Sequence, residues 1–154
     1  MNREDYDVFR TNYLVNGLDD DSVRRLTELA EIHEAPEGAK LIAQGETGSD
    51  LIVILRGLAK VWCCNKQLGE KGPGAVVGEV ALLDNGPRSA DVVAATPVTY
   101  ALFDGTTLKR FMAGNRDAGF LVLLNLSRVL SLALREATQQ IEDLKAEARE
   151  PAHP

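Results

Sequence analysis

The chain has 154 residues, of which 45% are apolar and 26% are charged, and its formal net charge is −6 at pH 7. This length and balance are typical of one domain with its own hydrophobic core. A membrane span is not expected, because no uninterrupted apolar run approaches the roughly 18 residues required. A nucleic-acid-binding face is disfavoured too, because it needs a basic patch and no run of five basic residues occurs.

Residues 1–34 are predicted to form N-terminal helices. They begin with Met1-Asn2-Arg3-Glu4-Asp5-Tyr6, which lacks the apolar core of a secretion signal, so we expect a cytoplasmic protein. Apolar residues at helical spacing predict a weakly amphipathic helix over residues 3–14. After a stop signal, Asp19-Asp20-Asp21-Ser22 supplies capping groups for a second helix that reaches Ile32. Helix capping explains these aspartates better than a metal site does.

Residues 35–103 alternate short apolar segments with glycine turns. This pattern predicts an antiparallel β-roll (jelly roll) rather than a βαβ sheet. The most apolar segment is Leu51–Leu55, which we interpret as a buried strand. Gly45, Gly48 and Gly57 lie in the turns around it, where we expect positive φ angles rather than contact with a ligand.

The two cysteines, Cys63 and Cys64, are adjacent near the end of a predicted strand. Neighbouring strand residues point to opposite faces, so we expect one buried and one exposed thiol rather than a shared tetrahedral metal site. The histidines, His33 and His153, are far apart in the sequence, and no metal cluster is predicted.

The stretch from Gly78 to Val93 holds the residues best suited to bind an anion. A glycine and an acid precede one turn of good helix formers, which Gly86-Pro87 then ends. The first N–H groups of such a helix lack carbonyl partners, so they can face an anion. Arg88 follows and offers a fork of donors suited to a phosphate. Glu79 would repel that phosphate unless it accepts a hydrogen bond from a sugar hydroxyl, so the pattern indicates a phosphorylated sugar.

Residues 104–148 are predicted to form C-terminal helices. Asp104 can cap a first helix that ends near Gly114-Asn115, and a long helix without proline follows. Apolar residues in this helix alternate at spacings of three and four, which suggests a coiled-coil seam. The seam consists of Leu123, Leu126, Leu130, Ala133, Ala137 and Leu144, with Gln140 as its one polar member. Packing on the chain's own roll and self-association as a homodimer both stay open.

Gly78-Glu79-x-Ala81-Leu82 followed by Pro87-Arg88-Ser89-Ala90 resembles the phosphate-binding cassette of the cyclic nucleotide-binding domain family. That family includes regulatory subunits of cyclic-nucleotide-dependent kinases, tails of gated channels and the catabolite activator type of bacterial regulator. The resemblance extends over residues 14–144 and implies an α+β fold, with a β-roll between N-terminal helices and a long C-terminal helix. It also implies cAMP or cGMP as the ligand. Val77 and Asp91 depart from the aromatic residue and the threonine that members often have there, which leaves base preference and affinity open.

The resemblance assigns roles by position. Arg88 would bind the phosphate, Glu79 would accept the ribose 2′-hydroxyl, and Ser89 would bind the phosphate and could favour a guanine base. The implied ligand-binding residues are Gly78, Glu79, Val80, Ala81, Leu82, Pro87, Arg88, Ser89 and Ala90. A side chain of the last helix would cover the base, and the candidates are Arg128, Leu132 and Arg135. The alternatives are a surface arginine paired with Asp84 or Asp91, and an ordinary acidic residue in a first helical turn.

Three functional classes compete. The favoured one is a cyclic nucleotide sensor that signals through movement of its C-terminal helix to an unknown effector protein or to an oligomer. The second is an interaction scaffold with a silent or altered pocket, which the intact Glu79 and Arg88 pair disfavours. An enzyme is not expected, because the sequence shows no Ser/His/Asp set, metal cluster or paired catalytic carboxylates. Only a short polar tail follows Leu144, so we expect a stand-alone member without a helix-turn-helix domain.

Overall fold

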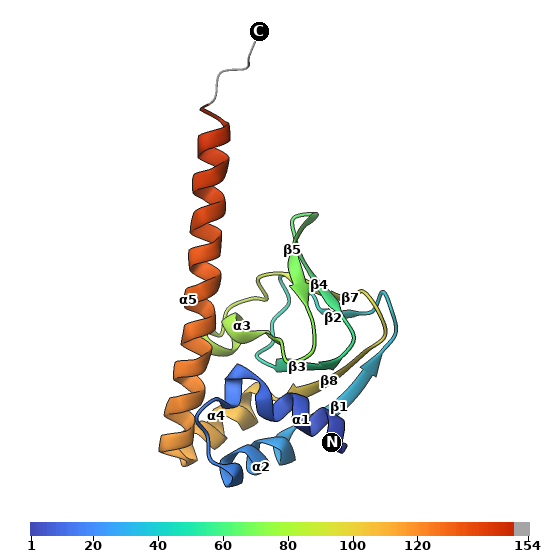
Figure 1. Cartoon of the computed structure of the whole chain (residues 1–154), viewed down its shortest axis with the longest axis vertical. Helices are drawn as coiled ribbons and strands as arrows, with labels where there is room; N and C mark the ends of the chain where they lie inside the picture. The colour runs from blue at the N-terminus through green and yellow to red at the C-terminus, as the bar shows by residue number, and fades with distance from the viewer. Residues whose placement is uncertain (150–154) are drawn as a thin grey trace.

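Helices occupy both ends of the chain and strands its middle, so the α+β architecture expected from the sequence is correct (Figure 1). The computed structural model describes residues 1–149. The helices are α1 (Arg3–Thr11), the 3-10 helix η1 (Tyr13–Val15), α2 (Asp20–Leu29), α3 (Glu79–Asp84), α4 (Gly105–Gly114) and α5 (Arg116–Glu147). The strands are β1 (Glu31–Ala35), β2 (Lys40–Ile42), β3 (Leu51–Arg56), β4 (Ala59–Cys63), β5 (Lys66–Lys71), β6 (Val76–Val77), β7 (Asp91–Ala94) and β8 (Val98–Phe103).

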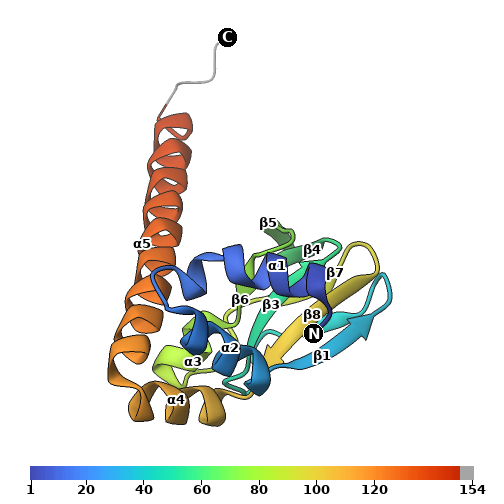
Figure 2. The same cartoon turned by 60° about the horizontal axis from the view of Figure 1, so that its bottom comes forward.

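Two four-stranded sheets make up the roll, and every strand pair in them is antiparallel. One sheet has the order β1-β8-β3-β6 and the other the order β2-β7-β4-β5. The first sheet lies next to α1, α2 and α4, as Figure 2 shows. The short helix α3 lies between β6 and β7 in the chain, where the two sheets and α5 meet (Figure 1).

Strand β3 divides the hydrophobic core into two parts. Leu51, Val53 and Leu55 face the helices and join the larger cluster, which includes Phe9, Phe103 and Leu126. Ile52 and Ile54 point the opposite way, into the interior of the roll. A strand covered on both faces has no polar side, which explains the unbroken apolar run in the sequence.

The N-terminal boundary of the roll differs from the prediction. Helix α2 ends at Leu29, and Glu31 already pairs with Leu102 of β8. Residues 31–34, which the sequence assigned to helices, therefore belong to strand β1. Ladder hydrogen bonds to β8 replace the helix here, and this tertiary effect leaves no local signal in the sequence.

Helix α5 is the longest element, with 32 residues, and only its first part is buried. Ala118, Val122 and Leu126 pack into the larger core cluster. An 18-residue window of α5 has a mean hydropathy of 1.5 and 28% of it is buried, so by length and composition alone the helix could cross a bilayer. Part of that apolar character faces the core, where Ala118, Val122 and Leu126 are buried.

The predicted seam on α5 is not a free face. Leu126 is fully buried in the chain's own core, and Leu130 and Ala133 line a cavity described below. The exposed large apolar residues of α5 share only Leu123 and Leu144 with the predicted seam. They are Phe120, Leu123, Leu132, Leu134, Ile141 and Leu144.

Candidate functional site

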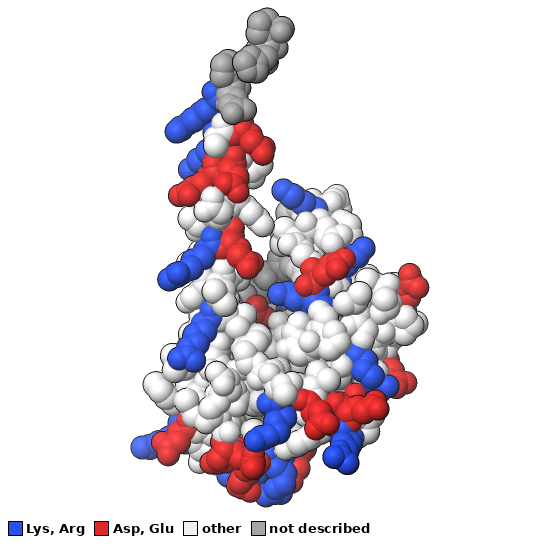
Figure 3. All heavy atoms as spheres, in the orientation of Figure 1, with Lys and Arg blue, Asp and Glu red and all other residues white. Residues whose placement is uncertain are grey.

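A cavity of about 300 Å³ lies between the roll and α5, and Figure 3 shows a hollow there. Residues predicted to bind the ligand line it from α3 and from the segment after it: Gly78, Glu79, Val80, Ala81, Arg88, Ser89 and Ala90. Leu82 and Pro87 are not among its lining residues; Leu82 is fully buried beneath α3. The rest of the wall is mostly apolar and comes from Ile42, Val61, Leu68, Val77, Val92, Leu130 and Ala133, together with Lys71.

Gly78 shapes the end of α3 that faces this cavity. Its φ of +93° is in the left-handed region, and an added Cβ would lie 2.6 Å from the Asp50 carbonyl oxygen and 2.9 Å from Nη1 of Arg88. A side chain is therefore excluded by both conformation and space. The Leu82 N–H donates to the Gly78 carbonyl, and among the described residues the N–H groups of Glu79, Val80 and Ala81 have no backbone partner. These three donors are free to face an anion.

Arg88 is fixed beside these donors by its backbone and by its side chain. Its N–H donates to the Glu46 carbonyl and its carbonyl accepts from the Gly45 N–H, each at 2.9 Å. Its Nη1 donates to the carbonyl oxygens of Asp50 at 2.9 Å and of Gly78 at 3.4 Å. Part of the guanidinium fork is used to hold the side chain in place, and the remaining donors are available to a ligand.

Neither proposed ion pair of Arg88 forms. Asp91 accepts the Gln44 N–H at 2.7 Å and pairs with Lys40 at 3.2 Å, which lowers its pKa. Asp84 accepts the Gly86 N–H at 2.7 Å. Within residues 1–149, no carboxylate lies within salt-bridge distance of Arg88. A guanidinium held by carbonyls keeps its full positive charge for an anion.

The sequence profile of the cyclic nucleotide-binding domain matches residues 32–115, more than half of the chain. The chain belongs to the cyclic nucleotide-binding domain family.

Individual relatives agree with this assignment. The chain is 31% identical to a cAMP-dependent protein kinase regulatory subunit from Eremothecium gossypii over 66% of its own length and 22% of that protein. It is similar to the crystal structure of a cyclic nucleotide-binding domain from Methylobacillus flagellatus KT, with a TM-score of 0.79, 28% identity and coverage of 91% and 82%. A regulatory subunit of a cAMP-independent protein kinase A from Trypanosoma brucei matches with a TM-score of 0.74 and 31% identity over 90% and 49%. The chain spans 22% to 30% of the length of four kinase regulatory subunits that it matches in sequence.

In this cyclic nucleotide-binding domain, Gly48 packs closely against Arg88, which the sequence alone did not indicate. Gly45 and Gly57 have positive φ angles as expected, but Gly48 does not. An added Cβ at Gly48 would lie 3.3 Å from Nη2 of Arg88. This glycine is therefore explained by close packing against the guanidinium rather than by its backbone conformation.

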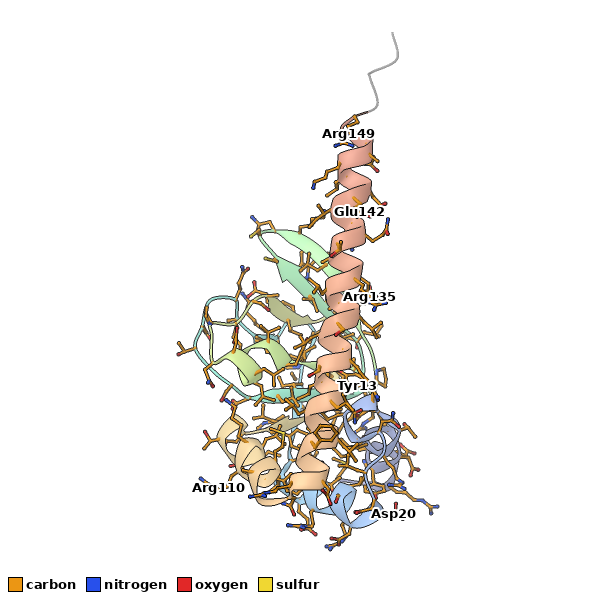
Figure 4. The ribbon with its side chains drawn as sticks, turned by 90° about the vertical axis from the view of Figure 1, so that its left-hand side faces the viewer. Tyr13, Asp20, Arg110, Arg135, Glu142 and Arg149 are labelled. Carbon is orange, nitrogen blue, oxygen red and sulfur yellow. The ribbon has the colours of Figure 1, made fainter. Side chains whose placement is uncertain are left out.

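The base-cap candidates do not lie where the sequence placed them. Arg128, Leu132 and Arg135 do not line the cavity, and Leu132 is 61% exposed. Figure 4 shows Arg135 projecting from the side of α5 away from the sheets. These three residues share one helix face, whereas Leu130 and Ala133 occupy the face toward the roll. Register on α5 depends on its packing on the core, which the local sequence does not reveal.

Tyr13 lies close to Glu79 from the N-terminal side of the domain. Its hydroxyl is buried and has no hydrogen-bond partner among the described residues. Burial raises the pKa of Tyr13, and the nearby Glu79 carboxylate raises it further. The phenol is therefore neutral at physiological pH, and η1 contributes a polar group near the sugar-binding candidate.

Proposed function

We propose that this domain binds cAMP or cGMP in the cavity and reports its occupancy through α5. One observation carries the proposal: the Arg88 guanidinium, which has no carboxylate partner within residues 1–149, is fixed beside the free N–H groups of α3 at an apolar cavity. This combination suits a molecule that has a phosphate at one end and an aromatic base at the other.

Different residues of the cavity would bind different parts of the ligand. Arg88, the α3 N–H groups and Ser89 would bind the cyclic phosphate, and Glu79 would accept the ribose 2′-hydroxyl. The apolar side chains of Val61, Leu68 and Leu130 would contact the base. Ser89 is also the residue that would favour guanine, so exchanging it for alanine would shift preference toward cAMP.

Helix α5 can respond to the ligand because Leu130 and Ala133 form part of the cavity wall. A ligand shifts the position of this helix only as far as it binds one arrangement more tightly than the other. The output would then pass to an effector protein or to a second copy of the chain. This role is regulatory and non-catalytic, and we place it in the cytoplasm.

A homodimer through α5 is part of this proposal, in a corrected register. Five of the exposed apolar residues lie on one heptad seam, at positions 120, 123, 134, 141 and 144. The same seam includes Ser127, Leu130 and Ala137. Apolar residues that repeat every three and four positions favour packing against a second helix of the same kind.

The second candidate function is an interaction scaffold of the same fold, whose pocket binds no ligand or a different ligand. The similarity to a regulatory subunit of a cAMP-independent kinase favours keeping it, since 31% identity is as high as that to the cAMP-dependent subunit from Eremothecium gossypii. The retained Glu79 and unpaired Arg88 favour the cyclic nucleotide.

Calorimetric titration of nucleotide-free protein with cAMP, and separately with cGMP, distinguishes the two candidates. We expect saturable one-to-one binding at micromolar or tighter affinity for at least one nucleotide. A folded protein that gives no heat with either would support the silent or altered pocket instead.

A further inference from the structure

The two adjacent cysteines lie on the same side of the hairpin between β4 and β5, contrary to the sequence expectation. Cys63 is the last residue of β4, and Cys64 begins the two-residue turn with Asn65. Cys64 and Asn65 have φ angles of +52° and +63°. This left-handed turn interrupts the strand alternation at Cys64. The two Sγ atoms are therefore only 3.6 Å apart.

Both thiols are free and neither is fully buried. Cys63 is half-buried and Cys64 is exposed. Gln44 Nε2 contacts the Cys63 Sγ at 3.4 Å. A shallow cavity beside them is lined by Lys40, Gln44, Trp62, Cys64, Asn65, Asp91 and Val93. The pair thus forms a solvent-accessible dithiol, separate from the nucleotide cavity.

The surroundings exclude a zinc site of ordinary type. Among residues 1–149, no group of three or more His, Cys, Asp or Glu side chains could hold a metal ion. Asp91, a carboxylate on the same shallow cavity, is already engaged with Gln44 and Lys40. Structural zinc needs four protein ligands, and this hairpin offers two.

The distance between the two sulfurs limits the coordination geometry of any atom that both of them bind. With bonds of about 2.3 Å, as in zinc thiolates, two sulfurs on one centre lie about 3.5–3.8 Å apart at angles of about 100–110°. A linear two-coordinate ion would need roughly 4.6 Å with the same bond length. The observed 3.6 Å fits a bent, pyramidal centre.

We propose that Cys63 and Cys64 form a chelating site for a trivalent arsenical. In a compound R–As(OH)₂, each thiol sulfur forms a bond to arsenic and displaces one hydroxyl, which leaves with the thiol proton as water. Two As–S bonds form, two As–O bonds break and two waters are released, with no change of oxidation state. A pyramidal arsenic centre with one other substituent needs only the two sulfurs present here.

The protonation state of the pair agrees with this exchange. The hydrogen bond with Cys64 raises the pKa of Cys63, with further contributions from burial and from the charge of Cys64. Because Cys63 keeps its proton at neutral pH, it supplies the proton that leaves with one of the two hydroxyls. The same shift makes Cys63 a weaker thiolate nucleophile toward single-site alkylation.

The probe for a test is phenylarsine oxide, which condenses with two thiols and releases one water. The full chain is kept reduced with a phosphine, which is not a thiol competitor, and Cys63→Ser and Cys64→Ser serve as matched one-thiol controls. Intact mass gives the stoichiometry. The fluorescence of Trp62, the only tryptophan, gives the affinity.

We expect one phenylarsenic group per wild-type chain, released by a small dithiol but not by an equal concentration of a monothiol. Each serine variant should bind at least a hundredfold more weakly while keeping the wild-type circular dichroism spectrum. If either variant bound within threefold of wild type, or if wild type took up two groups, the chelate would be excluded.

Discussion

At the scale of single residues, the cavity depends on how the charge of Arg88 is held. Two backbone carbonyls accept from its Nη1, and no carboxylate among the described residues neutralises it. Carbonyl oxygens fix the orientation of the guanidinium without cancelling its charge. Glu79 lines the same cavity, so the Glu79 carboxylate and the Arg88 guanidinium both face it without forming a salt bridge with each other. Because the two side chains do not pair with each other, one could bind a phosphate and the other a sugar hydroxyl of the same ligand.

Glu79→Gln tests the sugar role of that acid. A hydrogen bond to a charged acceptor contributes about 1.5–3 kcal/mol, so the variant should bind cAMP or cGMP about 10- to 100-fold more weakly. The matching 2′-deoxy nucleotide lacks the hydroxyl and should bind both proteins equally. Calorimetry on the four combinations provides the measurement. Glu37→Gln, an exposed acid in the turn before β2, is the control.

Equal losses for the 2′-hydroxyl and 2′-deoxy ligands would contradict this role of Glu79. In that case its carboxylate would act on the domain itself, for example through its neighbour Tyr13.

Most residues that line the cavity from α3 and from the segment after it could be predicted from the sequence, because a glycine, a short helix and an arginine are local signals. The roles of Gly48 and Leu130 could not. Gly48 packs on a side chain 40 positions later in the chain, and Leu130 reaches the cavity only through the packing of α5. Long-range packing of this kind leaves no pattern in a short window of sequence.

At the scale of elements, the helix starts follow local side-chain chemistry. The Asp19 carboxylate accepts the Ser22 N–H and the Asp104 carboxylate accepts the Thr107 N–H, each at 2.7 Å. Both caps confirm the sequence prediction. Their success and the failure at β1 have one physical cause: a cap is made by residues three apart, whereas β1 is made by pairing with β8.

The Asp104 cap should make the stability of the fold depend on pH in the acidic range. Hydrogen bonds from the Thr107 hydroxyl and then from its N–H lower the pKa of Asp104 below its ordinary value of 3.8. A group whose pKa is lower in the folded state stabilises the fold above its unfolded pKa. This contribution is lost as the pH falls through the folded pKa.

Asp104→Ala should therefore lower the melting temperature by about 2–5 °C at neutral pH. The difference from wild type should shrink as the pH falls through the folded pKa of Asp104, to the smaller contribution that the uncharged carboxyl group still makes as a cap. Asp104→Asn keeps a capping oxygen without the charge, so at neutral pH it should melt between wild type and Asp104→Ala. Thermal unfolding followed by circular dichroism between pH 2 and 7 measures both. A difference that stays constant across this range would rule out the carboxylate as the cause.

Asn125 joins two elements that are far apart in sequence. Its Nδ2 donates to the carbonyls of Leu14 at 3.1 Å and Asn16 at 2.8 Å, which fixes η1 against α5. Asn125→Ala would leave the buried Leu14 carbonyl without this donor and should cost about 1–3 kcal/mol in urea unfolding. Ser127→Ala, an exposed position on the same helix, should change stability by less than about 0.5 kcal/mol. Equal effects of the two variants would refute the bridging role.

At the scale of the whole molecule, α5 connects the cavity to a face that the other residues of 1–149 leave uncovered. The first part of the helix packs on the core, and its later part is exposed (Figure 1). Leu130 and Ala133 lie where the core-facing part ends. A ligand in the cavity would therefore contact α5 next to the exposed seam.

Leu134→Glu tests whether that seam joins two copies. The side chain is 68% exposed and lies within the heptad register, so a charge there should prevent helix pairing. We expect wild type to sediment as a concentration-dependent dimer and the variant as a monomer with unchanged nucleotide affinity. Ser131→Glu, at an exposed position outside the seam, introduces the same charge and is the control. A wild-type monomer at all concentrations would exclude the dimer.

The overall architecture could be predicted because alternating strands, glycine turns and long helical periodicity are properties of the whole sequence. The face of α5 that is buried could not, because both candidate registers are apolar. Leu126 appears in the sequence as one more seam residue, yet it is fully buried in the core. Only the packing of α5 against η1 and α4 selects between the registers.

The central claim is that Arg88 binds the phosphate of a cyclic nucleotide, and titration of Arg88→Ala against wild type tests it most directly. Losing a charge-assisted contact to a buried anion should cost about 2–5 kcal/mol, which is at least roughly 30-fold in Kd. Arg135→Ala is the matched control and should bind within twofold of wild type. Thermal unfolding checks that each variant is folded. If folded Arg88→Ala bound the nucleotide within threefold of wild type, the cavity described here would not be the nucleotide site.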